Sequence, residues 1–159
     1  MTQSSTTIVT FDVRGTPGAK GSPHHRVGKN GHVIVQETAS VKSWERLVRE
    51  TIAIDVFGGS TPSVPTFVDV PLAVHIVFRL VRPGNHWGKG KNAGKLSPTA
   101  PTSPAKKPDI DKLARSTLDS LTGIVFDDDS RIVWLGVAKV YAAPGREGAR
   151  IIVKEWRAA

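Results

Sequence analysis

The feature that most constrains this chain is the stretch from Lys106 to Ile132, where its carboxylates are concentrated. The chain is basic, with a formal net charge of +8, and no acidic residue occurs between Val70 and Pro108. Six of its 14 acidic residues lie in the constraining stretch: Asp109, Asp111, Asp119, Asp127, Asp128 and Asp129. A basic chain favours a polyanionic partner such as nucleic acid. The gathered carboxylates indicate divalent metal ions bound beside that partner.

The same stretch predicts an amphipathic helix between two acidic clusters. Apolar residues recur at helical spacing from Ile110 to Leu121. Asp111, Arg115 and Asp119 follow one another every four residues along the polar face. Pro108 prevents the helix from extending far toward the N-terminus, and Gly123 ends it. The helix therefore sets where the two clusters lie.

The remaining periodic segments predict one α+β domain spanning residues 1–159, with a frayed tail over 1–6. The order is β-β-α-β-loop-α-β-β, and two main helices pack on a mixed sheet. Strands are expected at 7–14, 32–36, 67–81, 131–141 and 149–156, and the first helix at 40–57, with Ser40 as its N-cap. Segment 67–81 is apolar on both faces, which is typical of a central strand.

Two segments lack periodicity and are rich in glycine, proline and cations. Residues 15–31 predict a loop. Residues 82–107 predict a long basic loop, and loops of that length are usually functional or disordered; a solvated linker is the alternative. Their cations are candidates for binding DNA phosphates: Lys20, His24, Arg26, Arg82, Lys89, Lys91, Lys95, Lys106 and Lys107.

The composition limits compartment and chemistry. The chain has no cysteine, so disulfides, zinc–thiolate sites and thiol nucleophiles are excluded. No signal peptide is visible, and no apolar run approaches the roughly 18 residues of a membrane helix. We expect a cytoplasmic protein that does not bind membranes.

Two interpretations are open for each acidic cluster. Asp109 and Asp111 flank Ile110, so they either cap the helix or direct their oxygens at one hard cation such as Mg²⁺. The run from Asp127 to Asp129 is either a polar turn or a second set of ligands. Because the chain can fold back after the helix, we expect both clusters to meet. Unpaired carboxylates placed so close together require cations.

Three motifs in this chain resemble the RusA family of crossover junction endodeoxyribonucleases, also called Holliday junction resolvases. They are Lys107-Pro-Asp-Ile-Asp-Lys-Leu-Ala-Arg, Leu118-Asp-Ser-Leu-Thr-Gly and Asp128-Asp-Ser-Arg-Ile. The family pattern is Asp-x-Asp-Asn-Leu-x-Lys, then Asp-Ala-Leu, then Asp-Asp-x-Gln-Ile. The resemblance loosely covers the whole domain. The segment that begins at Asn92 is similar to members carried by phages, which implies a bacterial or phage-infected cell.

The resemblance implies the roles of individual residues. Asp109, Asp111 and Asp129 match the catalytic, metal-binding aspartates; because the acidic run here is three residues long, Asp128 is the fallback metal ligand for Asp129. The family's catalytic lysine falls on Arg115, which keeps the charge but cannot donate a proton. The implied activity is Mg²⁺-dependent resolution of four-way junctions by symmetric paired nicks in DNA recombination and repair, by a homodimer, with Mn²⁺ as a substitute metal. The alternatives are a non-catalytic protein that binds branched DNA and a less selective Mg²⁺-dependent nuclease.

Overall fold

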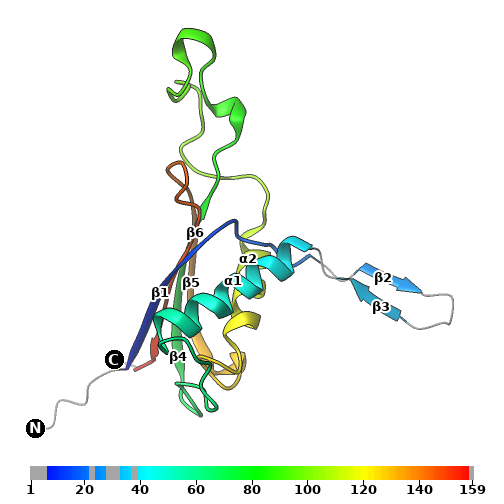
Figure 1. Cartoon of the computed structure of the whole chain (residues 1–159), viewed down its shortest axis with the longest axis vertical. Coiled ribbons are helices and arrows are strands. Elements are labelled where there is room, and N and C mark those ends of the chain that lie inside the picture. The colour runs from blue at the N-terminus through cyan, green and yellow to red at the C-terminus, as the bar shows by residue number, and fades with distance from the viewer. Residues whose placement is uncertain (1–6, 22–23, 28–32, 37–38, 158–159) are drawn as a thin grey trace, which may run out of the picture.

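The computed structural model describes residues 7–21, 24–27, 33–36 and 39–157, with the backbone alone for 24–27 and 33–36. Two helices cover one face of a mixed four-stranded sheet, which confirms the predicted α+β class (Figure 1). The elements are β1 (Ile8–Arg14), β2 (His24–Val27), β3 (Val33–Gln36), α1 (Ala39–Asp55), β4 (Leu72–Leu80), α2 (Ile110–Leu121), β5 (Ile132–Tyr141) and β6 (Gly148–Glu155), with the 3-10 turns η1 (Gly84–His86), η2 (Gly90–Asn92) and η3 (Asp129–Arg131).

The sheet has the strand order β1-β6-β4-β5. β4 runs antiparallel to β6 and parallel to β5, so Ile76 lies opposite both Ile151 and Val137. The predicted central position of this strand is confirmed. β5 lies at the sheet edge, and its far side makes no strand pairing among the described residues.

The core lies between the helices and one face of the sheet. Alternate residues of the strands point to this face because side chains alternate along a strand. The buried residues at its centre are Phe11, Val13, Val74, Ile76, Phe78 and Ile151 from the sheet, Trp44, Val48 and Ile52 from α1, and Leu113 and Leu121 from α2. On the opposite face, His75 and Trp134 are exposed and their rings lie 6.3 Å apart.

A buried hydrogen bond joins the two helices and gives a stability prediction. Nε1 of Trp44 donates to Oγ1 of Thr117 at 3.0 Å, and both side chains are fully buried. Thr117→Val keeps the shape but leaves the indole N–H without an acceptor, so we expect the free energy of unfolding to fall by about 1–3 kcal/mol. Urea unfolding measures this. Thr51→Val is the control, since the Thr51 hydroxyl only donates to the Leu47 carbonyl in its own helix; equal effects of the two substitutions would contradict the prediction.

Several predicted boundaries were wrong. The segment predicted as a strand from 67 forms one only from Leu72, because Asp69 has a φ of +54° and Pro71 has no N–H to donate. Part of the predicted loop 15–31 is strand β2, which pairs with β3. Ser40 lies inside α1 and does not cap it. The predicted tail 1–6 lies outside the described residues.

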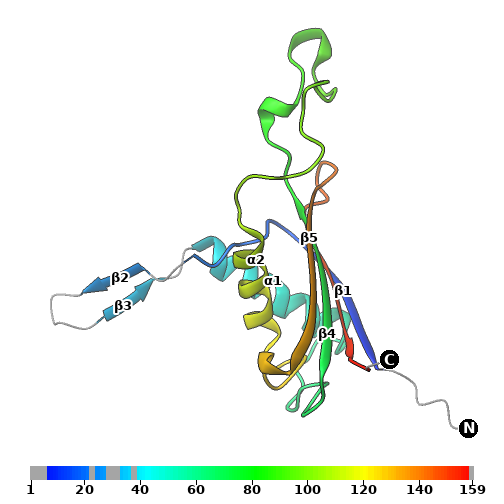
Figure 2. The same ribbon diagram turned by 180° about the vertical axis from the view of Figure 1, so that it is seen from behind.

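Residues 82–107, which we call the arm, extend beyond the end of the sheet (Figures 1 and 2). The arm turns back on itself through η1 and η2. Its two limbs are joined by hydrogen bonds from Gly88 N to Lys95 O and from Ser97 N to His86 O, each 2.9 Å long. The segment predicted as a long loop therefore has local structure without helical or strand periodicity.

Candidate functional site

The first acidic pair lies at the start of α2. Asp109 occupies the N-cap position, yet its side chain makes no capping hydrogen bond. Its carboxylate instead contacts Nζ of Lys112 at 3.1 Å. Asp111 is exposed in the first turn. Both carboxylates face solvent at the positive end of the helix dipole, where negative charge is favoured.

The surroundings of Asp109 keep it ionised. The hydrogen bond from Lys112 lowers the pKa of Asp109, with smaller contributions from Lys107 and Lys139. Lys139 on β5 also donates to the carbonyl oxygens of Lys106 and Pro108, at 2.7 and 2.9 Å. The sheet edge thereby anchors the segment that carries Asp109.

The second acidic cluster follows α2. Oδ2 of Asp127 contacts Arg131 and the Asp69 backbone N–H, which is a structural role. Asp128 accepts a hydrogen bond from the Ser130 N–H at 2.8 Å and so begins η3; this bond lowers the pKa of Asp128. Asp128 and Asp129 are exposed, and both line an open groove.

The two clusters do not meet within one chain. α2 has 12 residues, and at 1.5 Å per residue it separates its ends by about 18 Å. Asp109 is the N-cap at one end of α2, and η3 follows the opposite end of the helix; Figure 2 shows the chain leaving α2 at that opposite end. The described residues contain no group of three or more His, Asp or Glu side chains that could hold a metal ion. The expectation that the chain folds back to the helix start was wrong.

The groove at the second cluster contains side chains that the sequence did not group together. Its lining is Lys20, Glu45, Arg49, Asp119, Thr122, Asp128 and Asp129, around a volume of about 430 Å³. Nζ of Lys20 lies 2.7 Å from Asp119 and 3.7 Å from Glu45. The only sequence signal was that Asp119 shares the polar face of α2 with Asp111 and Arg115. Arg115 is exposed midway along this face.

The loop after β1 places Lys20. It passes over both helices, where Lys20 N donates to the Lys112 carbonyl at 3.0 Å and the Ser116 hydroxyl donates to the Gly18 carbonyl. A Cβ at Gly18 would lie 2.5 Å from the Ser40 carbonyl oxygen, so only glycine fits. Lys20, predicted to bind DNA, is thereby held against the acidic groove.

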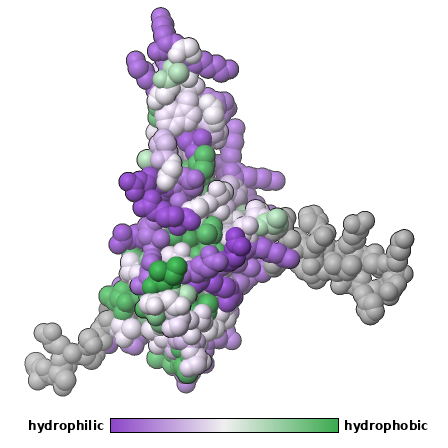
Figure 3. All heavy atoms as spheres, in the orientation of Figure 1, coloured by the Kyte–Doolittle hydropathy of each residue, from purple (hydrophilic) through white to green (hydrophobic). Residues whose placement is uncertain are grey.

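The other predicted DNA-binding cations lie mainly on the arm. Lys89, Lys91 and Lys95 are exposed on its outer part, where hydrophilic side chains project from the surface (Figure 3). Arg82 lies at its root, and its guanidinium is 4.1 Å from the centroid of the Tyr141 ring. Lys106 and Lys107 line a cavity beside that ring. The side chains of His24 and Arg26 lie outside the described residues.

Among the described residues, no helix combines the length and apolar character that a bilayer crossing requires.

The sequence is similar to those of known proteins. The sequence model of the family described as endodeoxyribonuclease RusA matches residues 16–154. The uncharacterized protein YqaN of Bacillus subtilis (strain 168) is 26% identical over 149 residues, which cover 92% of this chain and 96% of that protein. Family membership implies a nuclease that acts on Holliday junction DNA. The match includes both acidic clusters, α2 and the arm, and the chain belongs to the RusA endodeoxyribonuclease family.

Proposed function

We propose that this chain is a Mg²⁺-dependent endodeoxyribonuclease that resolves four-way DNA junctions by symmetric paired nicks, and that it acts as a homodimer. The observation that carries the proposal is the placement of two exposed carboxylate pairs at the two ends of one helix in a RusA-family fold. The pairs are Asp109 with Asp111, and Asp128 with Asp129.

The carboxylates fit the chemistry of Mg²⁺. This ion prefers hard oxygen ligands and usually binds through one or two carboxylates together with waters and substrate phosphates. Asp109, at the N-cap, and Asp111, in the first turn of α2, supply two such groups, and both reach solvent. Asp128 and Asp129 supply two more. Hydrogen bonds from Lys112 and from the Ser130 N–H lower the pKa values of Asp109 and Asp128, so these two carboxylates stay ionised well below neutral pH.

A two-fold dimer would bring the separated pairs together. When two α2 helices lie antiparallel across a two-fold axis, the start of each helix lies beside the end of the other. Asp109 and Asp111 of one subunit would then face Asp128 and Asp129 of the partner subunit. Each site would use carboxylates from both chains, and the dimer would hold two identical sites for two equivalent strands.

The surface of β5 supports an interface in this region. Among the residues whose burial the structure describes, four of the twelve exposed large hydrophobic residues lie on this strand: Val133, Trp134, Leu135 and Val140. Leu135 pairs with the core-facing Val74, so it points to the sheet face that carries α2. Ile110 at the start of α2 is 37% exposed. The outer side of β5 has no strand partner among the described residues, and the strand exposes apolar side chains. These two features are typical of a surface that a partner covers.

Different residues of the chain have different roles in the proposed phosphodiester hydrolysis. Asp109, Asp111 and Asp129 would hold the metal, which would supply a bound water of lowered pKa and positive charge for the phosphate. Arg115 lies exposed between them along α2 and steadies the phosphate as a permanent cation. The lysines of the arm bind the phosphates of the duplexes that meet at the junction.

A cleavage assay tests this function. A labelled four-way junction and a linear duplex are incubated with the full chain, with Mg²⁺ or with chelator. We expect paired nicks in the junction, only with Mg²⁺. Binding of the junction without cleavage would support a non-catalytic protein, and equal cleavage of both substrates would support a less selective nuclease; either result contradicts the proposal.

Lys112 gives a prediction about metal affinity. Its ammonium contacts Asp109 at 3.1 Å and therefore competes with a bound cation. Lys112→Asn removes this charge, and we expect Mg²⁺ to bind up to about fivefold more tightly, since an exposed ion pair contributes about 0–1 kcal/mol. Isothermal titration of Mg²⁺ into the chain measures this. Lys42→Asn on α1 is the control, and weaker Mg²⁺ binding by Lys112→Asn would contradict a metal at Asp109.

The arm gives a prediction about salt dependence. Replacing Lys89, Lys91 and Lys95 together by alanine removes three exposed cations from its outer part. We expect weaker junction binding and a salt slope smaller by about 3, one for each lost phosphate contact. Anisotropy titrations at several salt concentrations measure the slope. A control variant with alanine at Lys42, Arg46 and Lys154 loses the same charge elsewhere; equal slopes for the two variants would refute a role for the arm.

A further inference from the structure

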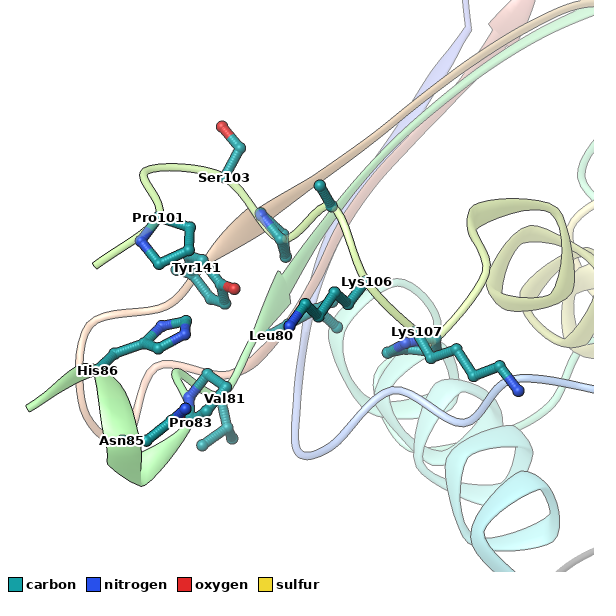
Figure 4. A pocket seen from close by; sticks show the side chains of 13 residues that line it. Leu80, Val81, Pro83, Asn85, His86, Pro101, Ser103, Lys106, Lys107 and Tyr141 are labelled. Carbon is teal, nitrogen blue, oxygen red and sulfur yellow. The ribbon is translucent and has the colours of Figure 1, made fainter. Parts of the chain in front are cut away.

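A cavity of about 280 Å³ opens where the arm leaves the sheet (Figure 4). Its walls are largely apolar and come from β4 and both limbs of the arm. They include Leu80, Val81, Pro83, Pro101 and Pro104. Pockets for drug-sized ligands measure roughly 300–1,000 Å³, so this cavity suits a smaller flat group such as one nucleobase.

Two rings form part of the wall. The rings of His86 and Tyr141 meet edge to face, with centroids 5.4 Å apart. Arg82 lies over the Tyr141 ring but does not line the cavity, so it supports the ring from outside. Tyr141 itself lines the cavity. Stacking of a base on such a ring is a common way to hold a single-stranded nucleotide.

Two residues with polar side chains, His86 and Asn85, lie in the wall of the cavity. Nδ1 of His86 is buried and has no hydrogen-bond partner among the described residues. A buried polar atom without a partner is rare in folded proteins and calls for a ligand or a water. The amide of Asn85 lies in the same wall and offers both a donor and an acceptor.

The cavity lies beside the carboxylates at the start of α2. Its lining continues through Lys106, Lys107 and Pro108, and the next residue is Asp109. Lys106 extends across the cavity toward Tyr141, whereas Lys107 points away from it (Figure 4). A nucleotide whose base enters the cavity would thus have the Lys106 cation across the cavity and the Lys107 cation outside it within reach of its phosphate.

We propose that this cavity binds one unstacked nucleotide of the DNA, with its base against Tyr141 and its phosphate at Lys106 and Lys107. The site selects a nucleotide that has left the duplex near the scissile phosphate. Four-way junctions supply such nucleotides more readily than linear duplexes, because unpairing is easiest where stacking is interrupted. This inference rests on the proposed function and adds a base-binding site to it.

The test compares two single strands of equal charge. One is a tetranucleotide of thymidine, and the other is an abasic strand of the same length. Their affinities for the full chain are measured by anisotropy at low salt with chelator present, so that cleavage does not occur. We expect the strand with bases to bind about 5- to 150-fold more tightly, the range for stacking one base.

Three variants test whether the preference for the strand with bases arises at the cavity. Ala105 lines the cavity and is exposed, so Ala105→Leu fills space without disturbing the core; we expect it to lose most of the preference for bases. Ala93→Leu makes the same change on the outer arm and should keep the preference. Tyr141→Leu, checked for folding by circular dichroism, should lose the preference as Ala105→Leu does.

The outcomes separate this site from the nuclease activity. Equal binding of the two strands, or an unchanged preference in Ala105→Leu, would overturn the base-binding site. Junction cleavage is measured in parallel with Mg²⁺. Cleavage without a base preference refutes the cavity alone, whereas a base preference without cleavage supports the cavity and refutes the proposed function.

Discussion

Asp109→Asn is expected to reduce cleavage of a four-way junction by about 10²–10³-fold or more, while the junction still binds. The substitution removes a charged metal ligand and keeps the size of the side chain. A metal ion contributes several kcal/mol of charge stabilisation in the transition state, and each 1.36 kcal/mol corresponds to a factor of ten in rate. Single-turnover cleavage of a labelled junction at saturating protein measures the loss.

The binding measurement separates chemistry from affinity. The side chain of Asp109 is 43% exposed, and among the described residues its carboxylate contacts the half-exposed Lys112 alone, so the substitution should not unfold the chain. Asp55→Asn, at the end of α1, removes an exposed carboxylate elsewhere and should leave the rate unchanged. A rate for Asp109→Asn within about tenfold of the wild type would contradict a metal at this position.

The sequence predicted the helices and strands in which apolar residues recur at the period of a helix or a strand. α2 was found almost to the residue because its apolar face repeats at helical spacing and because Pro108 and Gly123 limit it. β2 was missed because a short strand pairing outside the main sheet carries no such alternation. The structure of the arm was also missed, since it comes from backbone hydrogen bonds such as that from Gly88 N to Lys95 O.

The sequence offered candidate site residues but did not predict their arrangement. The motifs identified Asp109, Asp111 and Asp129, but spacing alone could not show which way the chain runs after α2. Val125 and Phe126 are buried, and Phe67 N donates to the Val125 carbonyl at 2.9 Å. These contacts hold the segment at the far end of the helix. The apolar residues of the turn, and not its acids, therefore decide where Asp129 lies.

The placement of Lys20 shows the same limit. The sequence offers it as one cation among several in a basic loop. Its side chain in fact reaches Asp119, 99 residues away in the chain. Such a contact depends on the close passage of Gly18 over α1, which permits no side chain. Pairings of this kind follow from packing and leave no local pattern in the sequence.

Mixing two inactive variants, Asp109→Asn and Asp129→Asn, is expected to restore cleavage of the four-way junction. In the proposed dimer each site joins Asp109 of one subunit to Asp129 of the partner subunit. Asp109→Asn alone and Asp129→Asn alone each damage both sites. A heterodimer of the two variants concentrates both substitutions in one site and leaves the other intact. Combining the proteins should therefore restore cleavage that neither shows by itself.

This mixing experiment is the most direct measurement of the central claim, that the two ends of α2 form a metal site only between subunits. The variants are mixed in equal amounts, allowed to exchange subunits, and assayed on a labelled four-way junction with Mg²⁺. Random exchange makes about half of the dimers heterodimers with one intact site each, so about a quarter of the wild-type sites should return. The predicted result is nicking of single strands without paired nicks. A mixture as inactive as its two components would contradict a site shared between subunits.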